Sequence, residues 1–203
     1  MTVVKICGIR DAGSARAAAE AGADLLGFHF CSSLRRISPE TARSIVAELP
    51  GRPPLVGVFI DQTEDEVAAA VELVGLDFVQ LHGAERPGFR APVPVIKALK
   101  VRGGAVPDAG AWPDPVLLDS WSPDQRGGTG HSWDWGLAGG LTASRQVIVA
   151  GGLSAGNVGE VVRLLRPHGV DVSSGVEAAV GRKDPQRMRA FVQAVRDADD
   201  AID

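Results

Sequence analysis

The chain has 203 residues, of which 45% are hydrophobic and 23% are charged, a composition typical of a globular protein rather than a disordered one. Its formal net charge of −4 offers no long-range attraction to nucleic acid or to an anionic membrane, so any bound anion must be held by a local site. No apolar run approaches ~18 residues and the first residues do not resemble a secretory signal, so we expect a cytoplasmic protein without a nucleic-acid or membrane partner.

In the first third of the chain, short apolar strands alternate with helices. The run VVKICG predicts a buried strand that ends at Cys7, and Asp11 can cap the helix that follows it. A second strand, LLGFHF, precedes a helix that Ser38 can cap. A third strand, LVGVFI, precedes a helix that starts after Thr63 and has an acidic first turn, which complements the helix dipole.

The middle of the chain is rich in glycine and proline. Strands are predicted at FVQLHG, VIKALKV and VLLDS, but the connections ERPGFRAPVP and RGGAVPDAGAWP disfavour a regular helix. We therefore expect a shortened or missing helix after the fifth strand. The sixth strand is followed by a long loop that contains GGTG and by a weak helix, DWGLAGGL, which its glycines destabilise.

The last third returns to regular alternation. QVIVAGG predicts a strand that enters a glycine pair, and a helix is predicted to start at Ser154. GVDVSSG predicts the final strand, and DPQRMRAFVQAVRDA predicts a closing helix.

The pattern contains eight strands, and each consists of a continuous apolar run. The strands begin near Val3, Leu25, Leu55, Phe78, Val95, Val116, Gln146 and Val170. Continuous hydrophobicity is typical of strands covered on both faces, as in a parallel sheet. We therefore predict a small α/β protein, a (β/α)₈ TIM barrel formed by a single domain over residues 1–203. A doubly wound open sheet is the alternative, but no strand-linked dinucleotide glycine fingerprint is present.

In such a barrel, functional side chains gather at the carboxyl ends of the strands. The residues at or just beyond these ends are Cys7, Arg35, His82, Asp119, Gly151, Gly152, Ser173, Ser174 and Gly175. Strands one and six would bring Cys7 and Asp119 to one rim, where a base and an acid could act on opposite sides of a ligand. A carboxyl group at a partly dry barrel mouth can keep its proton near neutral pH. The alternatives are a buried core thiol at Cys7 and a loop-stabilising carboxylate at Asp119.

Two glycine-containing segments on the last two strands predict a phosphate site. AGGL contributes Gly151 and Gly152, and DVSSGVE contributes Ser173, Ser174 and Gly175. Glycines let the backbone approach an anion closely, and a short helix after strand eight would direct its N–H groups at it. The alternative is that these residues form only tight turns and a helix cap.

Other polar residues near the rim have two interpretations each. Arg35 could bind a substrate carboxylate bidentately, or it could be solvated beside Arg36. His82 could hydrogen-bond a ligand, or its partner could be the backbone at the edge of the core. Gly128 and Gly130 belong to the GGTG loop, which could fold over a ligand or remain a surface loop.

The two cysteines, Cys7 and Cys31, make no disulfide framework, and no Cys/His cluster has zinc spacing, so we expect reduced thiols and no metal. Lys5 is expected to point into the barrel and to pair with Asp171 across the junction of strands eight and one. Its positive charge could also hold Cys7 as a thiolate, because nearby positive charge lowers the pKa of a thiol from about 8.5.

Over nearly its whole length the chain resembles the phosphoribosylanthranilate isomerase family of tryptophan biosynthesis. The resemblance rests on VKICGI, GADLLGFHF, RRISPE, VGVFID, VQLHG, VIKA, LLDS, GGTG with WDW, VIVAGGL with NV, and VDVSSGVE. It implies a (β/α)₈ barrel that converts an aminoaldose, N-(5-phosphoribosyl)anthranilate, to the aminoketose 1-(2-carboxyphenylamino)-1-deoxyribulose 5-phosphate without a cofactor.

The resemblance also implies roles for individual residues. Cys7 would be the general base that removes the C2 proton, and Asp119 the general acid that protonates the furanose ring oxygen. The AGG and SSG segments would hold phosphate, and the arginine before SPE would hold the anthranilate carboxylate. The loop CSSLR is shorter than the family's usual loop by about one residue, so this arginine is either Arg35 or Arg36.

Two other functions are compatible with a phosphosugar-binding barrel. One is an isomerase that also acts on the histidine-pathway aminoaldose, but that substrate has two phosphates and the sequence predicts one phosphate site. The other is a non-catalytic barrel that binds a phosphosugar. We expect a small-molecule substrate and a monomer, with other oligomeric states left open.

Overall fold

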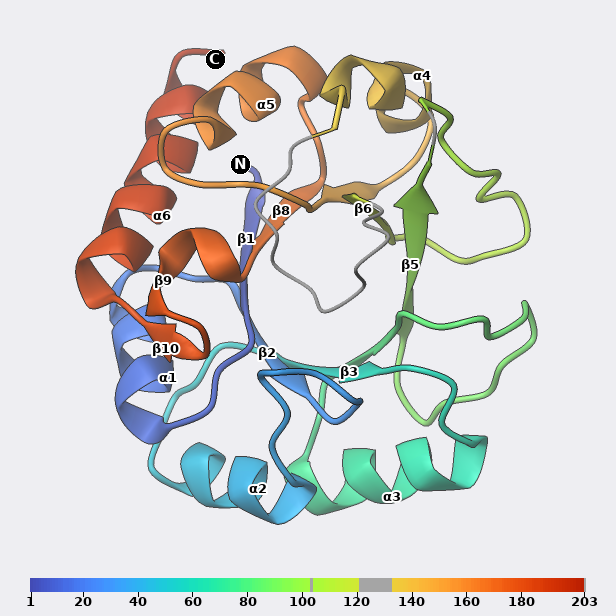
Figure 1. Cartoon of the computed structure of the whole chain (residues 1–203), viewed down its shortest axis with the longest axis vertical. Coiled ribbons are helices and arrows are strands. Elements are labelled where there is room, and N and C mark those ends of the chain that lie inside the picture. Colours follow the sequence, from blue (N-terminus) through green and yellow to red (C-terminus); the bar gives the residue numbers. More distant parts are fainter. Residues whose placement is uncertain (103, 121–132, 203) are drawn as a thin grey trace.

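The computed structural model describes residues 1–102, 104–120 and 133–202 of the chain (Figure 1). Eight parallel strands form a closed barrel in sequence order, and β1 pairs with β8 to close it. The strands are β1 (Val3–Cys7), β2 (Leu25–His29), β3 (Leu55–Phe59), β4 (Phe78–Leu81), β5 (Val95–Val101), β6 (Val116–Ser120), β7 (Val147–Val149) and β8 (Gly169–Val172). The predicted (β/α)₈ barrel is confirmed.

In Figure 1 helices lie around the ring of strands except on the right-hand side beside β5, where loops lie. The helices are α1 (Ala12–Glu20), α2 (Pro39–Ala47), α3 (Glu64–Val74), α4 (Gly139–Thr142), α5 (Val158–Leu165) and α6 (Pro185–Asp200), with 3₁₀ turns η1 (Trp135–Ala138) and η2 (Ser174–Val176). The predicted N-caps Asp11 and Ser38 are confirmed, because each accepts a hydrogen bond from a backbone N–H of the first turn. Thr63 caps α3 in the same way.

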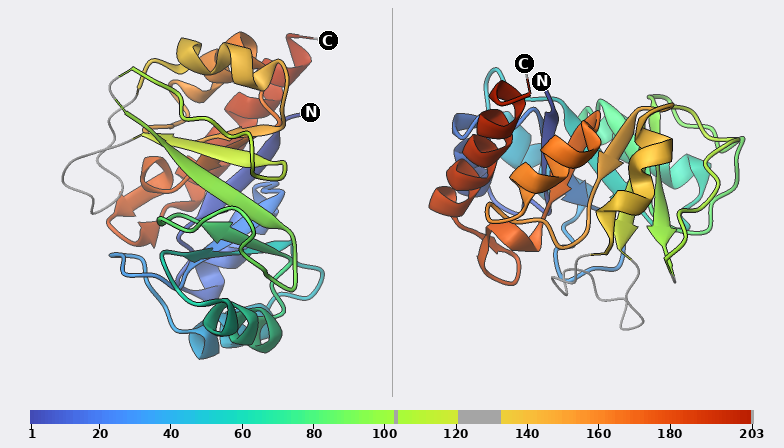
Figure 2. Two further views of the ribbon diagram at one scale, coloured as in Figure 1. Left: turned by 90° about the vertical axis from the view of Figure 1, so that its right-hand side faces the viewer. Right: turned by 90° about the horizontal axis from the view of Figure 1, so that it is seen from above.

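The irregular middle of the chain also agrees with the prediction. Among the described residues, no helix lies between β4 and β5 or between β5 and β6, and loops cover these strands in the left view of Figure 2. Glycine and proline in both connections account for this, because they disfavour continued helical backbone.

The start of α5 differs from the prediction. The helix begins at Val158 and not at Ser154. The Asn157 side chain accepts from the Ser154 backbone N–H at 2.8 Å and donates to the Gly152 carbonyl at 2.9 Å. These bonds hold the intervening residues in a turn, so the helix starts after it.

A short antiparallel hairpin after β8 was not predicted. It consists of β9 (Glu177–Ala179) and β10 (Arg182–Lys183), and it lies outside the barrel in Figure 1. Its strands of three and two residues are too short to give a periodic signal in the sequence.

The core has two apolar layers. A large cluster fills the space between the strands and the helices, and a smaller one fills the barrel interior. The interior cluster consists of Leu25, Val56, Ile96, Ala98, Leu117, Ile148 and Ala150. Polar side chains lie nearer the carboxyl ends of the strands, where the candidate site is found. No helix in the described ranges has the length and apolar character needed to cross a membrane.

Candidate active site

Cys7 lies at the carboxyl end of β1 and is only 3% exposed. It pairs in register with Gly27 on β2, where a Cβ atom would lie 2.6 Å from the Cys7 sulfur. Glycine is therefore required opposite the thiol. The sulfur belongs to a small buried cluster with Cys31 and Val58, so Cys7 is both packed and placed at the rim of the barrel.

A buried ion pair lies next to Cys7. Lys5 is fully buried, and its Nζ donates to Asp171 Oδ1 at 2.9 Å, which confirms the predicted pair across β1 and β8. Burial alone would lower the pKa of Lys5, but the charges of Asp171 and Cys7 outweigh it and raise that pKa. Lys5 is therefore a permanent cation beside the sulfur.

The Cys7 thiol experiences opposing effects. Burial raises its pKa above the ordinary value of a thiol. The Lys5 charge, a hydrogen bond from Lys5 and the Lys183 charge lower this pKa, and the Asp171 charge raises it. Burial dominates, so the pKa of the thiol is raised.

His29, at the end of β2, contacts the Cys7 sulfur. The distance from His29 Nε2 to Cys7 Sγ is 3.2 Å, and His29 Nδ1 lies 2.9 Å from Ser33 Oγ. Burial, followed by the charges of Lys5 and Arg35, lowers the pKa of His29 to about 3, so the imidazole is neutral. Sequence reasoning missed this residue. The signal was present, because alternation along β1 and β2 places residue 29 on the same face as Gly27.

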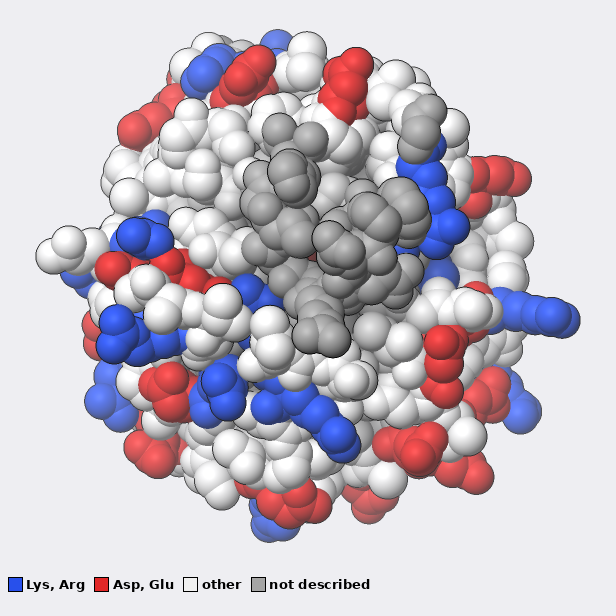
Figure 3. Space-filling view, in the orientation of Figure 1, with Lys and Arg blue, Asp and Glu red and all other residues white. Residues whose placement is uncertain are grey.

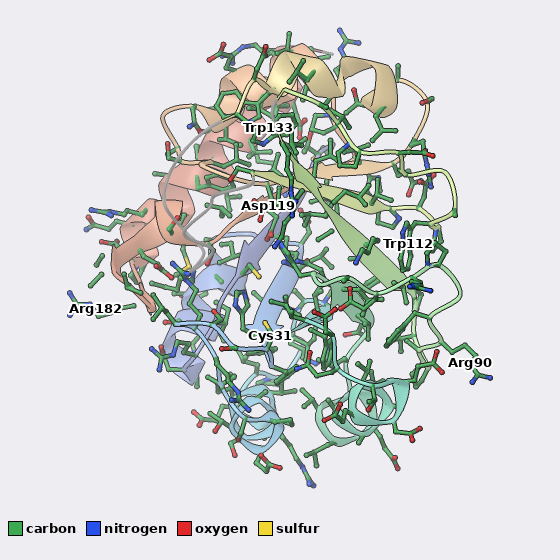
Figure 4. All side chains as sticks on the ribbon, turned by 45° about the vertical axis from the view of Figure 1, so that its right-hand side comes forward. Cys31, Arg90, Trp112, Asp119, Trp133 and Arg182 are labelled. Atoms are coloured by element: carbon green, nitrogen blue, oxygen red, sulfur yellow. The ribbon has the colours of Figure 1, made fainter. Side chains whose placement is uncertain are left out.

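Asp119, at the carboxyl end of β6, has a histidine partner. His82 Nε2 lies 3.2 Å from Asp119 Oδ2, and Gln80 Nε2 lies 3.1 Å from His82 Nδ1. The Asp119 side chain is 27% exposed and points toward the barrel interior, whereas Arg90, at the periphery, points away from it (Figure 4). His82 is thus bonded to side chains from β4 and β6, and not only to the backbone as one of our two interpretations held.

The hydrogen bonds from Gln80 through His82 to Asp119 orient the His82 ring. The amide Nε2 of Gln80 can only donate, so His82 Nδ1 is assigned as its acceptor and His82 Nε2 as the donor to Asp119. His82 therefore holds one oxygen of the carboxyl group.

Arg35 is buried, with a side chain 3% exposed, whereas the neighbouring Arg36 is exposed. Nε and Nη2 of Arg35 donate to the two oxygens of Glu177, each at 2.7 Å. The Arg35 side chain also packs against Gly8, where a Cβ atom would lie 2.5 Å from Arg35 Cδ. Arg35 is therefore not the solvated residue of our alternative interpretation, and it lies beside the end of β1.

Lys183, on β10, connects this pair to the end of β8. Its Nζ donates to Glu177 Oε1 at 3.0 Å and to the Ser173 carbonyl at 2.9 Å. Burial opposes ionisation of Glu177, but hydrogen bonds and charges from Arg35 and Lys183 hold the pKa of Glu177 below its ordinary value. We did not predict Glu177 or Lys183 as site residues, because they belong to the unforeseen hairpin.

The two loops predicted to hold phosphate lie against each other. Gly151 and Gly152 have φ values of +88° and +70°, a backbone conformation that favours glycine. A Cβ atom on Gly175 would overlap the Leu153 carbonyl oxygen, so glycine is needed where the loop after β8 packs on the loop after β7. Ser173 and Ser174 lie in the same loop as Gly175, and Lys183 places a cation beside it.

The surface around this face is not uniformly acidic. Lys and Arg side chains are grouped near β9, β10 and the segment before α2 in Figure 3, although the chain as a whole is acidic. Asp and Glu side chains lie among them, so the positive charge here is local and partly paired. Gly128 and Gly130 lie outside the described residues. Within the described ranges, no group of three His, Cys, Asp or Glu side chains is placed to hold a metal ion.

Comparison with known proteins gives consistent matches over nearly the whole chain. The family model for N-(5'-phosphoribosyl)anthranilate isomerase matches residues 4–194. The protein of that name from Desulforudis audaxviator is 47% identical over 206 residues, which cover 98% of this chain and 100% of that protein.

Solved structures agree. The phosphoribosyl anthranilate isomerase of Thermus thermophilus superposes with a TM-score of 0.88 at 39% identity and covers 97% of this chain and 99% of that one. A phosphoribosyl anthranilate isomerase in complex with reduced 1-(o-carboxyphenylamino)-1-deoxyribulose 5-phosphate has a TM-score of 0.83 at 34% identity, with 97% and 100% covered.

Proposed function

The chain belongs to the N-(5'-phosphoribosyl)anthranilate isomerase family and catalyses the isomerisation of phosphoribosylanthranilate in tryptophan biosynthesis, for which we propose that Cys7 is the general base and Asp119 the general acid. The observation that supports these roles is the placement of the two side chains. They end β1 and β6, which are separated around the ring by β7 and β8, so their groups face one mouth from different sides.

The reaction needs a proton donor and a proton acceptor at different atoms of one sugar. Asp119 donates a proton to the furanose oxygen, the C1–O bond breaks, and a protonated Schiff base forms between C1 and the anthranilate nitrogen. The Cys7 thiolate then removes the C2 proton, which the positive nitrogen has made acidic, and an enolamine results. Protonation at C1 and loss of the hydroxyl proton at C2 give the aminoketose, so atoms and charge balance.

Neighbouring residues support the proposed roles of Asp119 as acid and Cys7 as base. His82 donates to one oxygen of Asp119, which orients the carboxyl group toward the interior. Lys5 provides a fixed positive charge near Cys7, which favours the thiolate against the effect of burial. Neither role requires a metal or an organic cofactor, and the resemblance that we noted in the sequence also implies none.

A direct assay tests the activity. The anthranilate group of the substrate is fluorescent, so its disappearance can be followed in purified protein, and the gene should restore tryptophan-free growth to a bacterium that lacks this step. The activity assignment would be overturned by correctly folded protein that neither consumes the substrate nor restores growth. The dual-substrate isomerase and the non-catalytic barrel are not favoured by the matched relatives.

The loops at Gly151–Gly152 and Ser173–Gly175 are proposed to bind the substrate phosphate. Their contact through Gly175 and the nearby Lys183 ammonium support this role. The GGTG residues Gly128 and Gly130 are also proposed to contact the substrate, and this proposal rests on the family resemblance alone.

Inorganic phosphate is expected to compete with the substrate, because it would occupy the same loops. Initial rates at several phosphate concentrations should show a rise in KM and an unchanged kcat. Potassium chloride at matched ionic strength is the control for general screening. Purely noncompetitive inhibition by phosphate would contradict the proposed site.

Arg35 is proposed to bind the anthranilate carboxylate. It lies beside Gly8 at the end of β1, and Glu177 already holds its guanidinium in a fixed orientation, whereas Arg36 is exposed.

Substitution Arg35→Lys is expected to raise KM by ~10-fold or more, because a lysine keeps the charge but loses the planar pair of donors. The matched control is Arg36→Lys, which should change KM by less than about twofold because Arg36 is exposed and exposed charged groups contribute little. Steady-state kinetics and thermal melting of both variants distinguish lost binding from lost stability. An unchanged KM in Arg35→Lys with a raised KM in Arg36→Lys would transfer the role to Arg36.

We also propose that the protein is a cytoplasmic monomer. The large apolar side chains that are exposed among the described residues come from separate elements, as is usual for monomers. They are Met1, Leu34, Ile60, Leu137, Leu164 and Val180. A base that must be a free thiol also suits a reducing compartment, and both cysteines are unpaired.

A further inference from the structure

His29 is the side chain that contacts the Cys7 sulfur and has no role in the proposed mechanism. Its Nε2 lies 3.2 Å from Cys7 Sγ, and its Nδ1 lies 2.9 Å from Ser33 Oγ. We propose that His29 is a positioning residue that donates a hydrogen bond to the Cys7 thiolate, with Ser33 holding the required tautomer. This inference rests on the proposed role of Cys7 as the base.

The hydrogen bonds around Ser33 indicate which ring nitrogen carries the hydrogen. Ser33 Oγ accepts from the Arg35 backbone N–H at 3.1 Å, and in the proposed arrangement its own hydroxyl hydrogen is donated to His29 Nδ1 at 2.9 Å. An imidazole that accepts at Nδ1 and is neutral has its hydrogen on Nε2. In the proposed tautomer the Nε2–H points at the Cys7 sulfur.

The charged groups around the ring explain why His29 acts as a neutral donor and not as a counter-ion. Lys5 on β1, Arg35 before α2, His82 beyond β4 and Lys183 on β10 all act against a proton on His29, after burial itself. An imidazolium is therefore strongly disfavoured, but a neutral ring can still donate one hydrogen bond. A neutral His29 can therefore donate a hydrogen bond to the thiolate without adding a second positive charge beside Lys5.

The same environment supplies positive charge that opposes the effect of burial on Cys7. Three cations and two carboxylates belong to the ion pairs around the sulfur, so the site has one surplus positive charge when Cys7 is a thiol. These groups are Lys5, Arg35, Lys183, Asp171 and Glu177. Cys31 is another titratable neighbour, and its own burial raises its pKa to about 11, so it stays neutral. Ionisation of Cys7 cancels the surplus, and His29 directs a donor at the charge that forms.

Packing at position 29 does not by itself require a polar side chain. Residue 29 follows Gly27 on the inward face of β2, and Gly27 is the residue that makes room for the Cys7 sulfur. An aliphatic side chain at position 29 could fill the space but would leave the thiolate without this donor. The histidine therefore adds a polar function to a position that packing alone does not require to be polar.

The test compares His29→Leu with His29→Gln, because glutamine can place its Nε2–H near the same point. The rate at which iodoacetamide alkylates Cys7 is measured against pH, and mass spectrometry of the Cys7 peptide separates it from Cys31. In His29→Leu the midpoint of the alkylation profile should rise by about one pH unit or more, and the acid limb of kcat/KM should move with it. His29→Gln should restore most of the shift.

A second variant avoids the interior of the barrel. Ser33→Ala removes the hydroxyl that holds the tautomer, and Ser33 lies on a partly exposed loop, so the fold should tolerate it. It should raise the midpoint in the same direction by a smaller amount.

Two outcomes are distinguishable. An unchanged alkylation midpoint in folded His29→Leu and Ser33→Ala, with Cys7→Ala inactive, would overturn the role of His29 and keep that of Cys7. Near-normal turnover in Cys7→Ala would overturn the base assignment, while the alkylation profiles would still report on the hydrogen bond from His29.

Discussion

Replacement of Cys7 by alanine is expected to lower kcat by ~10²-fold or more, because the variant has no group in place to remove the C2 proton. The fold should survive, since the apolar cluster that contains the lost sulfur is small and consists of Cys7, Cys31 and Val58. Stopped-flow or steady-state fluorescence of the substrate gives kcat, and circular dichroism gives the melting temperature.

The matched control for Cys7→Ala is Cys31→Ala, which removes the other buried thiol of the same cluster. It should keep near-normal kcat with a comparable loss of stability. A third variant, Cys7→Ser, should remain as inactive as alanine, because a hydroxyl in this site is far too weak an acid to serve as the base. Activity close to wild type in Cys7→Ala would exclude the thiol as the base.

The pH dependence of the wild type should follow from the raised pKa of the Cys7 thiol. Because the thiolate is the active form and burial raises the pKa, the reactive fraction increases as pH rises toward that pKa. We therefore expect kcat/KM to increase with pH on its acid side, and Cys7→Ala to lose this limb.

Asp119→Asn is expected to lower kcat by ~10²-fold or more and to change KM little. Asparagine has nearly the same shape and its carbonyl can still accept from His82, but it cannot donate an acidic proton to the ring oxygen. The effect should therefore appear in ring opening and not in binding. Asp200→Asn, the same substitution on the exposed end of α6, is the control and should match the wild type.

A second readout separates the acid role of Asp119 from a merely structural one. Asp119 is partly exposed and its partner in the structure is His82, so the melting temperature of Asp119→Asn should stay close to that of the wild type. Turnover near the wild-type value in a stable Asp119→Asn protein would exclude Asp119 as the acid.

Much of the fold could be predicted because it depends on local patterns. Continuous apolar runs indicated strands buried on both faces, and caps such as Asp11 and Ser38 act within one helical turn of their own position. The predicted start of α5 was wrong because a local signal had a local competitor. Ser154 is a good cap residue, but the Asn157 side chain organises a competing turn.

The candidate site was only partly predictable. Cys7, Asp119 and the two glycine loops end predicted strands, so the barrel topology alone places them at one rim. Arg35 was ambiguous because its environment depends on Glu177, which lies 142 positions away in the sequence. His29 was overlooked although strand alternation places it on the inward face of β2, because alternation gives the face and not the contact with Cys7.

The sequence by itself thus determined the eight strands, the barrel and the family, because strand periodicity, turn chemistry and short motifs are encoded within a few residues of each other. Only the tertiary structure decided which side chains meet around the sulfur. The contacts of Cys7 with His29, of Arg35 with Glu177 and of Lys183 with Ser173 join different strands and loops. Their distances depend on the closure of the barrel, which is a property of the whole ring and not of any one segment.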